Sequence, residues 1–308
     1  MKEMSCDLHI VGGALTGLLT AYCASSLDYK IVVTEREKIT LDNKKPTKDT
    51  RTTAIAEGSK VFLESQGLWK SIKSFAEPIK NIKVFDTTAN SNLDFKNPIT
   101  KSNLGYIVKN SKLISILIKE LEKKNNVNLI TGSKLNSISY NNSNIISFSN
   151  NKKINSKLII AADGKNSSVR KILGTNIFKK KYNEKALVIN FFHERPHNNI
   201  AYEFFLKTGP LAILPMQMES NMHQSALIWS NKQDTVDFFV SSNTNYNFIS
   251  EILNENIHEQ LGKVKKINSI QAFPLSAHIN ERFYENQKNQ RRISVTVLYA
   301  YEYGGNSI

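Results

Sequence analysis

The chain has 308 residues, of which 40% are hydrophobic and 22% are charged, and its formal net charge is +14. This length fits one large domain or two ordinary ones, and the composition excludes intrinsic disorder and collagen-like repetition. Two cysteines, Cys6 and Cys23, are too few for a disulfide framework, so we expect a reducing, intracellular setting.

No apolar run approaches the roughly 18–20 residues that span a bilayer. The N-terminus is charged and its apolar stretch is interrupted by Gly12 and Gly13, so it does not match a signal peptide. We therefore expect a cytoplasmic protein, either soluble or peripheral on the inner membrane face.

The excess positive charge has two interpretations. The basic residues are mostly scattered lysines, as an A/T-rich coding genome would produce, and the simpler interpretation is a solvated lysine-rich surface. The other is attraction to an anionic membrane face. Nucleic-acid binding is not expected, because zinc-finger spacing, basic helices with heptads and aromatic RNA-binding signatures are lacking.

The first 35 residues predict a strand, a glycine turn, a helix and a second strand. Residues 7–13 form an apolar run ending in glycines, which is typical of a buried parallel strand. Apolar residues then recur at helical spacing over 14–27, and 30–35 is a strand that ends on an acid. This order indicates a βαβ unit.

The middle of the chain predicts a polar loop over 38–50, a helix over 58–66 and an extended, irregular stretch over 78–100. A helix with a 3.6-residue period follows over 111–124. Short strands separated by asparagine-rich turns then predict a β-meander, at 127–130, 135–140 and 145–149. A buried strand over 158–162 leads into a helix over 167–173.

The pattern changes near residue 175, where strands follow one another without a glycine-opened helix between them. These strands are predicted at 186–192, 201–206, 211–216, 224–229 and 269–275, with a helix over 249–261. The fold class is therefore α/β, with a Rossmann-like domain of parallel sheet and β-meander and a second, mostly antiparallel sheet with helices.

The segment Gly12-Gly13-Ala14-Leu15-Thr16-Gly17 lies where a dinucleotide fingerprint would. The first glycine permits the tight turn, a small residue two positions later allows the pyrophosphate to approach, and Gly17 allows close helix–strand packing. Glu35 ends the second strand and can accept hydrogen bonds from ribose hydroxyls; its alternative is a solvent-facing strand end. Ala14 replaces the middle glycine of the fingerprint, and its methyl group narrows the space for the pyrophosphate but need not block it. The motif does not separate NAD from FAD.

Asp163 and Gly164 follow the strand over 158–162, at a position where ligands bind in open α/β sheets. The aspartate could accept hydrogen bonds from hydroxyl groups, and the N–H groups of the turn could meet a phosphate. The alternative is an aspartate that caps the following helix beside a glycine turn.

Together these residues resemble the class A flavoprotein aromatic hydroxylases, and within them the branch that hydroxylates the ring in ubiquinone biosynthesis. The resemblance runs from about residue 5 to 286. It rests on GGALTG with Glu35, Asp49-Thr50-Arg51, Gly105-Tyr106-Ile107-Val108-Lys109-Asn110, Ala162-Asp163-Gly164 through Arg170, Gly209-Pro210-Leu211-Ala212-Ile213-Leu214-Pro215 and Phe273-Pro274-Leu275.

The resemblance implies an FAD-dependent monooxygenase that uses NAD(P)H and O₂ to hydroxylate a prenylated phenol, alone or within a ubiquinone-biosynthesis complex. It implies an FAD-binding domain over 1–75 and 101–176 and a substrate domain over 76–100 and 177–280. The implied cofactor-binding residues are Gly12, Gly13, Ala14, Gly17, Glu35, Arg51, Asp163, Gly164 and Arg170. Arg51 could contact either the flavin or the substrate, and its alternative is a surface loop arginine. No catalytic side chain and no metal ligand is predicted.

The segment over 281–308 departs from the family, which continues there with an apolar strand into Gly-Asp-Ala-Ala-His. Here the chain reads Gln287-Lys288-Asn289-Gln290-Arg291-Arg292 and lacks this third FAD motif, as a truncated or frameshifted gene would. Three interpretations follow: a working monooxygenase, an inactive remnant of one, or another FAD- or NAD-dependent Rossmann oxidoreductase.

Some polar and aromatic residues carry weaker predictions. The six histidines show no metal-ligand spacing, and His193 and His197 are expected to be ordinary polar residues. Cys6 and Cys23 are expected to pack in a core. Tyr202, Phe204 and Phe205 either line a ring pocket or belong to a core.

Overall fold

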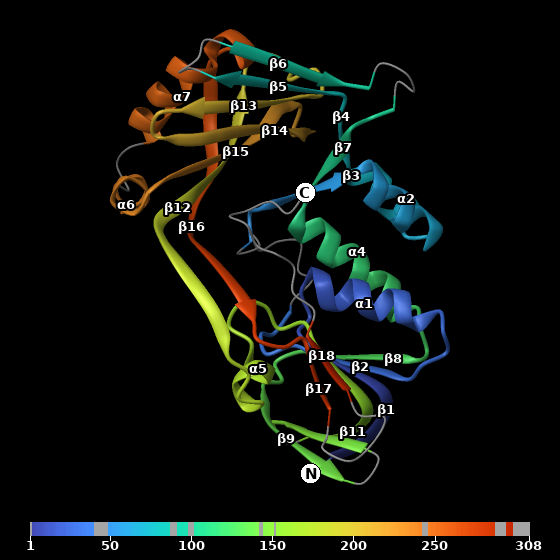
Figure 1. The fold of residues 1–308 in the computed structure, drawn as a ribbon. Coiled ribbons are helices and arrows are strands. Elements are labelled where there is room, and N and C mark those ends of the chain that lie inside the picture. Colours follow the sequence, from blue (N-terminus) through green and yellow to red (C-terminus); the bar gives the residue numbers. More distant parts are fainter. Residues whose placement is uncertain are drawn as a thin grey trace. The chain divides into compact units, whose positions relative to one another are not determined.

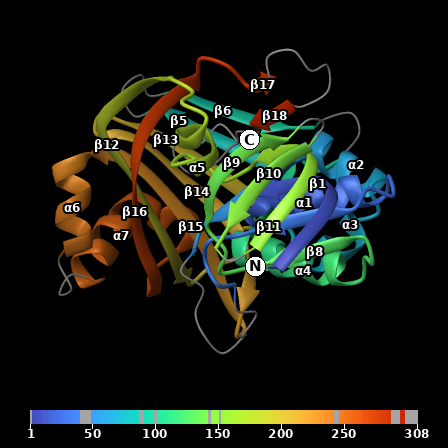
Figure 2. The same cartoon turned by 90° about the horizontal axis from the view of Figure 1, so that it is seen from below.

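The computed structural model describes residues 2–39, 49–86, 91–97, 102–141, 144–150, 152–241, 246–286 and 294–297 (Figures 1 and 2). The chain divides into two compact units. The first comprises Met1–Pro46, Leu113–Lys179 and His278–Tyr301, and the second comprises Thr47–Lys112, Lys180–Ala277 and Glu302–Ile308. Each unit is therefore assembled from separate stretches of the sequence.

The first unit contains an eight-stranded sheet in the order β17-β18-β11-β1-β2-β8, with β10 beside β11 and β9 beside β10. Its strands are β1 (Lys2–Val11), β2 (Ile31–Thr34), β8 (Val127–Ile130), β9 (Leu135–Asn141), β10 (Asn144–Ser149), β11 (Lys152–Ala161), β17 (Tyr284–Asn286) and β18 (Ser294–Val297). β1 pairs in parallel with β2 and β11, and β2 pairs in parallel with β8. β9, β10 and β11 form an antiparallel meander, visible in Figure 2. Parallel sheet and meander confirm the predicted Rossmann-like architecture.

Buried strands and short helices complete this unit. Helix α1 (Leu15–Ser25) joins β1 to β2, and most of α4 (Asn110–Glu122) and all of α5 (Ser168–Ile172) belong here. Every residue of β2 is buried, as expected for a parallel strand covered on both faces. Cys6 packs against Val32 and Ile154, which confirms its predicted place in a core, and burial raises the pKa of its thiol to about 12.

The second unit contains a seven-stranded sheet in the order β16-β12-β15-β14-β13-β5-β6 and a small sheet in the order β3-β7-β4. The strands are β3 (Thr52–Ala56), β4 (Glu77–Ile79), β5 (Asn81–Asp86), β6 (Ser91–Lys96), β7 (Gly105–Lys109), β12 (Ile177–His193), β13 (Ile200–Leu206), β14 (Gly209–Glu219), β15 (Met222–Lys232) and β16 (Val264–Asn280). β12, β15, β14 and β13 are joined antiparallel in that order, and β13 pairs in parallel with β5. The predicted antiparallel second half is confirmed.

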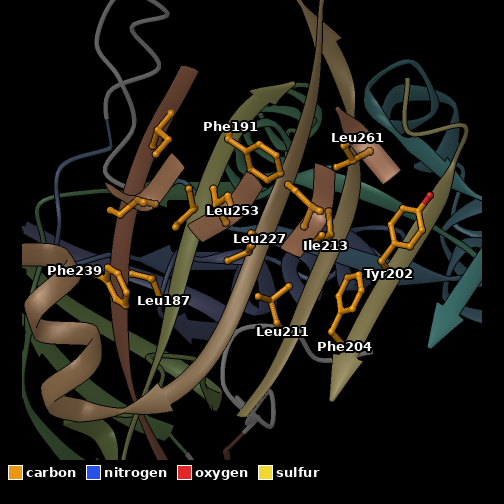
Figure 3. Close-up of a cluster of buried hydrophobic side chains, with 14 of the residues drawn as sticks. Leu187, Phe191, Tyr202, Phe204, Leu211, Ile213, Leu227, Phe239, Leu253 and Leu261 are labelled. Atoms are coloured by element: carbon orange, nitrogen blue, oxygen red, sulfur yellow. The ribbon is translucent and has the colours of Figure 1, made fainter. Parts of the chain in front are cut away.

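One face of the seven-stranded sheet packs against helices α6 (Gln233–Ser241) and α7 (Tyr246–Leu261), as Figures 1 and 3 show. Phe191, with no exposed surface, lies in this core together with Tyr202 and Phe204. Of the two predicted roles for these aromatic side chains, the core role is therefore confirmed for Tyr202 and Phe204. Phe205, the next residue of β13, is 48% exposed.

The opposite face of the same sheet carries a second, smaller apolar layer. Ala186 and Val188 of β12 lie there with Ile228 of β15, and the half-buried Ala212, Leu214, Phe273 and Leu275 pack against them. Leu214 also packs against a neighbouring cluster that contains Ile107 and Met216. The alternation of strand side chains therefore divides the sheet into a helix-covered core and a second apolar face.

The structure differs from the predicted elements in several places. The stretch over 78–100 contains the regular strands β4, β5 and β6 rather than irregular structure, and its residues 87–90 and 98–100 lie outside the described residues. Helices α2 (Glu57–Ser65) and α3 (Trp69–Ile72) and the 3-10 helix Lys73–Phe75 follow β3. Strand β3 and helix α6 were not predicted at all.

The departure over 281–308 is described only in part. β18 pairs in parallel with β11, and β17 pairs antiparallel with β18, so this segment adds two strands to the first sheet. Residues 287–293 and 298–308 lie outside the described residues. The predicted functional domains remain a prediction, because compactness alone does not say which unit holds which ligand. No helix within the described ranges has the length and apolar character to span a bilayer.

Candidate functional site

The glycine turn brings the ends of β1 and β11 into contact in the first unit. Gly12 has φ +113°, and a Cβ at this position would lie 2.2 Å from the carbonyl oxygen of Ala162. A Cβ at Gly17 would lie 1.9 Å from the carbonyl oxygen of Gly12. Both positions therefore require glycine, one for the crossing of the turn over β11 and one for the packing of α1 on the turn.

Helix α1 begins directly after this turn. Its N-cap residue is Ala14, which is exposed and offers no side-chain hydrogen bond, and the first turn of the helix contains no acidic residue. The amide N–H groups at this end and the positive end of the helix dipole are therefore available to an anionic ligand.

Glu35 lies immediately after β2 and is bound to the same turn. Its Oε2 accepts a hydrogen bond of 2.7 Å from the Gly13 amide, and its Oε1 accepts one of 2.9 Å from the Glu37 amide. A carboxylate has about four acceptor positions, so both oxygens retain a position for a hydroxyl donor. The strand end and the glycine turn are thus held together by the residue predicted to bind ribose.

Asp163 follows β11 and accepts hydrogen bonds from the first turn of helix α5. Its Oδ2 accepts hydrogen bonds from the Ser168 amide at 2.6 Å, the Ser168 hydroxyl at 2.8 Å and the Val169 amide at 3.2 Å. The N-cap residue of α5 is Ser167, whose hydroxyl accepts a hydrogen bond of 3.0 Å from the Arg170 amide, so Asp163 holds the helix start without being its N-cap. The Oδ1 of Asp163 is buried and has no hydrogen-bond partner among the described residues. One oxygen is structural, while the other remains an acceptor.

Gly164 and Arg170 shape the turn around this aspartate. Gly164 has φ +72° with open space around it, so glycine is favoured there by backbone conformation alone. Arg170 is 6% exposed and donates a hydrogen bond of 2.6 Å to the Lys165 carbonyl. Its guanidinium therefore stabilises the loop between Asp163 and α5.

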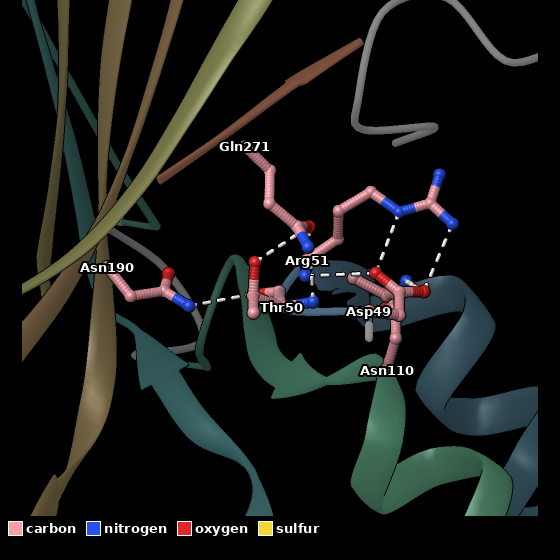
Figure 4. Close-up of polar contacts among 7 residues, drawn as sticks. Asp49, Thr50, Arg51, Asn110, Asn190 and Gln271 are labelled. Atoms are coloured by element: carbon pink, nitrogen blue, oxygen red, sulfur yellow. Dashed lines mark hydrogen bonds and ion pairs between the residues drawn. The ribbon is translucent and has the colours of Figure 1, made fainter. Parts of the chain in front are cut away.

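Arg51 lies in the second unit, within a polar network drawn in Figure 4. Its Nε and one terminal nitrogen donate to the two carboxylate oxygens of Asp49 at 2.9 and 3.0 Å, and its amide donates to Oδ1 at 3.0 Å. Asn110 donates to Asp49 Oδ2 at 3.2 Å. Burial alone would raise the pKa of Asp49, but the hydrogen bonds and charge of Arg51 hold it below its usual value.

Thr50, between these two residues, is fixed by two strands of the large sheet. Asn190 of β12 donates a hydrogen bond of 2.7 Å to the Thr50 carbonyl, and the Thr50 hydroxyl donates to Gln271 of β16 at 2.9 Å (Figure 4). The guanidinium carbon of Arg51 also lies 4.9 Å from the centre of the Phe273 ring. The segment therefore positions Arg51 over the second apolar face of the sheet.

Sequence reasoning did not identify Asn190 and Gln271. Each is a polar residue flanked by apolar ones in its strand, and that local interruption is the signal that could have singled them out. The Oδ1 of Asn190 is buried and has no partner among the described residues. Its amide thus has unused hydrogen-bonding capacity beside Thr50.

The structure places eight of the predicted residues in the first unit and Arg51 in the second. In the first unit it brings the turn over Gly12–Gly17, Glu35 and the turn at Asp163 to neighbouring strand ends. FAD, the cofactor implied by the sequence, fits this arrangement. Gly12, Gly13 and Gly17 leave no room for a Cβ, the start of α1 is uncapped, and the buried Asp163 Oδ1 suits a hydroxyl donor.

Three of the histidines, His9, His193 and His197, are buried and hydrogen-bonded. Within the described ranges, no group of three His, Cys, Asp or Glu side chains could hold a metal ion. His193 bonds to the Ser225 hydroxyl at 3.0 Å, and His197 to the Met216 carbonyl at 3.0 Å. His9, which sequence reasoning left without a role, is fully buried between Thr34 and Ser147.

Curated relatives of the chain include ubiquinone hydroxylases. The chain is 26% identical over 288 residues to the ubiquinone hydroxylase UbiL of Rhodospirillum rubrum, covering 91% of this chain and 64% of that protein. It is 31% identical over 256 residues to the ubiquinone biosynthesis monooxygenase COQ6 of Xenopus tropicalis, covering 76% of this chain and 53% of that protein. The chain thus spans between about half and two thirds of the length of these relatives.

Solved structures with the same fold include two bacterial monooxygenases. The p-nitrophenol 4-monooxygenase PnpA of Pseudomonas putida superposes with a TM-score of 0.71 at 14% identity, over 97% of this chain and 73% of that one. The probable FAD-dependent monooxygenase pqsL of Pseudomonas aeruginosa superposes with a TM-score of 0.73 at 13% identity, over 96% of this chain and 78% of that one. These similarities confirm the fold class. Residues 5–287 match the model of the FAD binding domain, so the chain belongs to that family and FAD is its cofactor.

Proposed function

We propose that this chain is an FAD-dependent monooxygenase that hydroxylates a prenylated phenolic ring in ubiquinone biosynthesis, using NAD(P)H and O₂. The observation that carries the proposal is the FAD-family match over residues 5–287 in a chain whose relatives are named ubiquinone hydroxylases. Bound FAD supplies the redox chemistry. The protein binds and orients the cofactor and the substrate, and it excludes water.

The first unit is proposed to hold the adenine-dinucleotide part of FAD. The amides at the start of α1 would meet the pyrophosphate, with Gly12, Gly13, Ala14 and Gly17 allowing its approach. Glu35 would accept from ribose hydroxyls. Asp163 would accept from a further hydroxyl through Oδ1, and Gly164 and Arg170 would shape the loop that presents it.

The second unit is proposed to hold the phenolic ring. Ala212, Leu214, Phe273 and Leu275 form a half-buried apolar face, which suits an aromatic ring. Arg51 lies over Phe273 with its guanidinium fixed by Asp49, so it would place a guanidinium–carboxylate pair at the edge of this face. The residues of the polar network would thereby orient the ring rather than transfer protons.

A substrate with a prenyl tail would be delivered from a membrane. The net charge of +14 suits peripheral contact with an anionic inner membrane face, from which such a substrate could enter. Association with other proteins of the same pathway would serve the same purpose. Sedimentation with anionic vesicles, compared with neutral vesicles, tests the membrane part of the proposal.

Flavin binding is the first test of the function. Titrating the full chain with FAD should give a saturable change in visible absorbance, and Glu35→Ala should weaken the affinity about tenfold, because ribose contacts of a charged acceptor are lost. Glu37→Ala is the matched control, since that side chain is 77% exposed in the same turn. Equal affinities for the two variants would remove Glu35 from the site.

Turnover is the second test. The FAD-loaded chain is incubated with NADH or NADPH, O₂ and a phenol carrying a short prenyl chain, and mass spectrometry detects the gain of one oxygen atom. Hydroxylated product supports the proposal. FAD binding without product would identify a chain that keeps the cofactor but does not hydroxylate, as expected of an inactive remnant.

A further inference from the structure

The second unit contains a pocket apart from the glycine turn and from the polar network around Arg51. It has a volume of about 250 Å³ and is lined by the 3-10 helix Lys73–Phe75, strand β7, the start of α4 and the end of β14. An apolar cavity of about 150 Å³ is large enough to take up benzene. This pocket therefore has room for a small organic group.

The base and rim of the pocket differ in polarity. Ile107 and Met216, each 2% exposed, form an apolar floor, whereas Phe75 and Met218 are 38% and 55% exposed and form an apolar part of the rim. Methionine side chains adapt their shape to a ligand more easily than branched ones do. The floor and this part of the rim therefore suit an unbranched or flat hydrocarbon group.

The remaining rim is charged. Lys109 forms an ion pair of 2.6 Å with Glu219, while the ammonium group of Lys112 lies 5.3 Å from the centre of the Phe75 ring. No carboxylate of the described residues forms an ion pair with Lys112. Two ammonium groups and one carboxylate leave one net positive charge above an apolar floor.

We propose that this pocket binds an amphipathic monocarboxylate, with its hydrocarbon part on Ile107 and Met216 and its carboxylate at Lys112. The single surplus positive charge matches one carboxylate. Lys109 lines the same pocket and would contact the ligand carboxylate as well as Glu219. A cationic amphiphile would meet two lysines, and an uncharged one would leave Lys112 unused. The binding proposed here is independent of FAD and of the hydroxylation reaction.

Three probes of equal chain length separate these possibilities: octanoate, octan-1-ol and octylammonium. Isothermal titration calorimetry of the full chain without added FAD should show saturable octanoate binding, at least about tenfold tighter than binding of either other probe. Equal binding of octanoate and octylammonium would overturn the proposal, because hydrocarbon contact alone would then explain the association.

Variants locate the site. Lys112→Gln should weaken octanoate binding about fivefold to tenfold and remove the preference over octan-1-ol, while the matched control Lys207→Gln, at an exposed lysine between β13 and β14, should leave both unchanged. Met218→Glu adds a like charge to the rim at an exposed position, so the variant should fold and lose octanoate binding. Unchanged affinity in Lys112→Gln or in Met218→Glu would place the ligand elsewhere and overturn the proposal.

Discussion

At the scale of single residues, His9 shows how burial changes the chemistry of a side chain in this protein. It has no exposed surface, and its two ring nitrogens lie 2.9 Å from the Thr34 hydroxyl and 2.8 Å from the Ser147 hydroxyl. Burial lowers its pKa from 6.5 to about 3. The neutral ring bridges two strands, and protonation would place an uncompensated charge in the core.

This burial predicts a pH dependence of stability. Because the unfolded chain binds the proton of His9 near pH 6.5 and the folded chain only near 3, stability is full above 6.5 and falls as the pH decreases toward 3. Between about pH 7.5 and about pH 5 the loss from His9 should be about 2 kcal/mol in urea unfolding. Burial also lowers the pKa of His193, to about 4, so this residue reduces stability at low pH in the same way.

The prediction for His9 is checked by comparing how much the free energy of unfolding changes with pH, rather than its absolute value. His9→Asn should lower the difference in unfolding free energy between the two pH values, even if it destabilises the protein at both. His258→Asn, at an exposed histidine of α7, should keep the full difference. A His9→Asn variant with the full pH dependence would show that His9 does not contribute to it.

The glycine turn provides a second prediction at this scale. Gly12→Ala should destabilise the protein by roughly 2 kcal/mol or more, because the added Cβ would overlap the Ala162 carbonyl and the backbone has φ +113°. Gly58→Ala is the control, since this residue of α2 has open space around it, and alanine there should stabilise by about 0.5–1 kcal/mol. Thermal unfolding of both variants measures the contrast, and equal changes would contradict it.

At the scale of elements, the segment 49–51 is fixed by contacts with α4, β12 and β16. The bidentate pair between Asp49 and Arg51 is about 30% exposed on each side, so water screens it only in part. A double-mutant cycle with Asp49→Asn and Arg51→Gln should give a coupling of about 1 kcal/mol in urea unfolding. The cycle for Asp94 and Lys96, an exposed pair at 3.6 Å on β6, should give a smaller one. Equal coupling energies for the two pairs would show that the Asp49 carboxylate does not hold Arg51 in place.

Local sequence signals predicted the elements whose formation depends on neighbours in the chain. The βαβ unit over 7–35 and helix α7 follow from periodicity and glycine placement. Strands β5 and β6 did not follow, because β5 is defined by parallel pairing with β13, more than 100 residues away, and β6 is exposed at every residue. A strand that depends on a distant partner, or one whose two faces are both exposed, shows little apolar–polar alternation in the sequence.

The candidate site divides in the same way. The spacing of Gly12, Gly17 and Glu35 could be read from the sequence, because each residue serves a turn or a strand end that local pattern defines. The contacts of Asn190 and Gln271 with Thr50 could not, since they join residues about 140 and 221 positions apart. Side-chain networks of this kind depend on the register of the sheet, which short motifs do not specify.

At the scale of the whole molecule, two units with separate cores allow stability and cofactor binding to be changed independently. FAD at about 100 times its dissociation constant should raise the free energy of unfolding by about 2.7 kcal/mol, provided that it binds the folded chain alone. Phe191→Leu, in the helix-covered core of the second unit, should lower stability by about 1–3 kcal/mol. Because the proposed dinucleotide contacts lie in the first unit, the stabilisation by FAD should persist in this variant.

Gly12→Ala provides the opposite case, since it alters the turn that would hold the pyrophosphate. Melting temperatures of the wild type and both variants, each with and without saturating FAD, distinguish the two effects. We expect the FAD-induced shift to be preserved in Phe191→Leu and lost in Gly12→Ala, although both variants melt earlier than the wild type. Loss of the shift in Phe191→Leu would mean that the second core contributes to FAD binding, and its persistence in Gly12→Ala would place the dinucleotide away from the glycine turn.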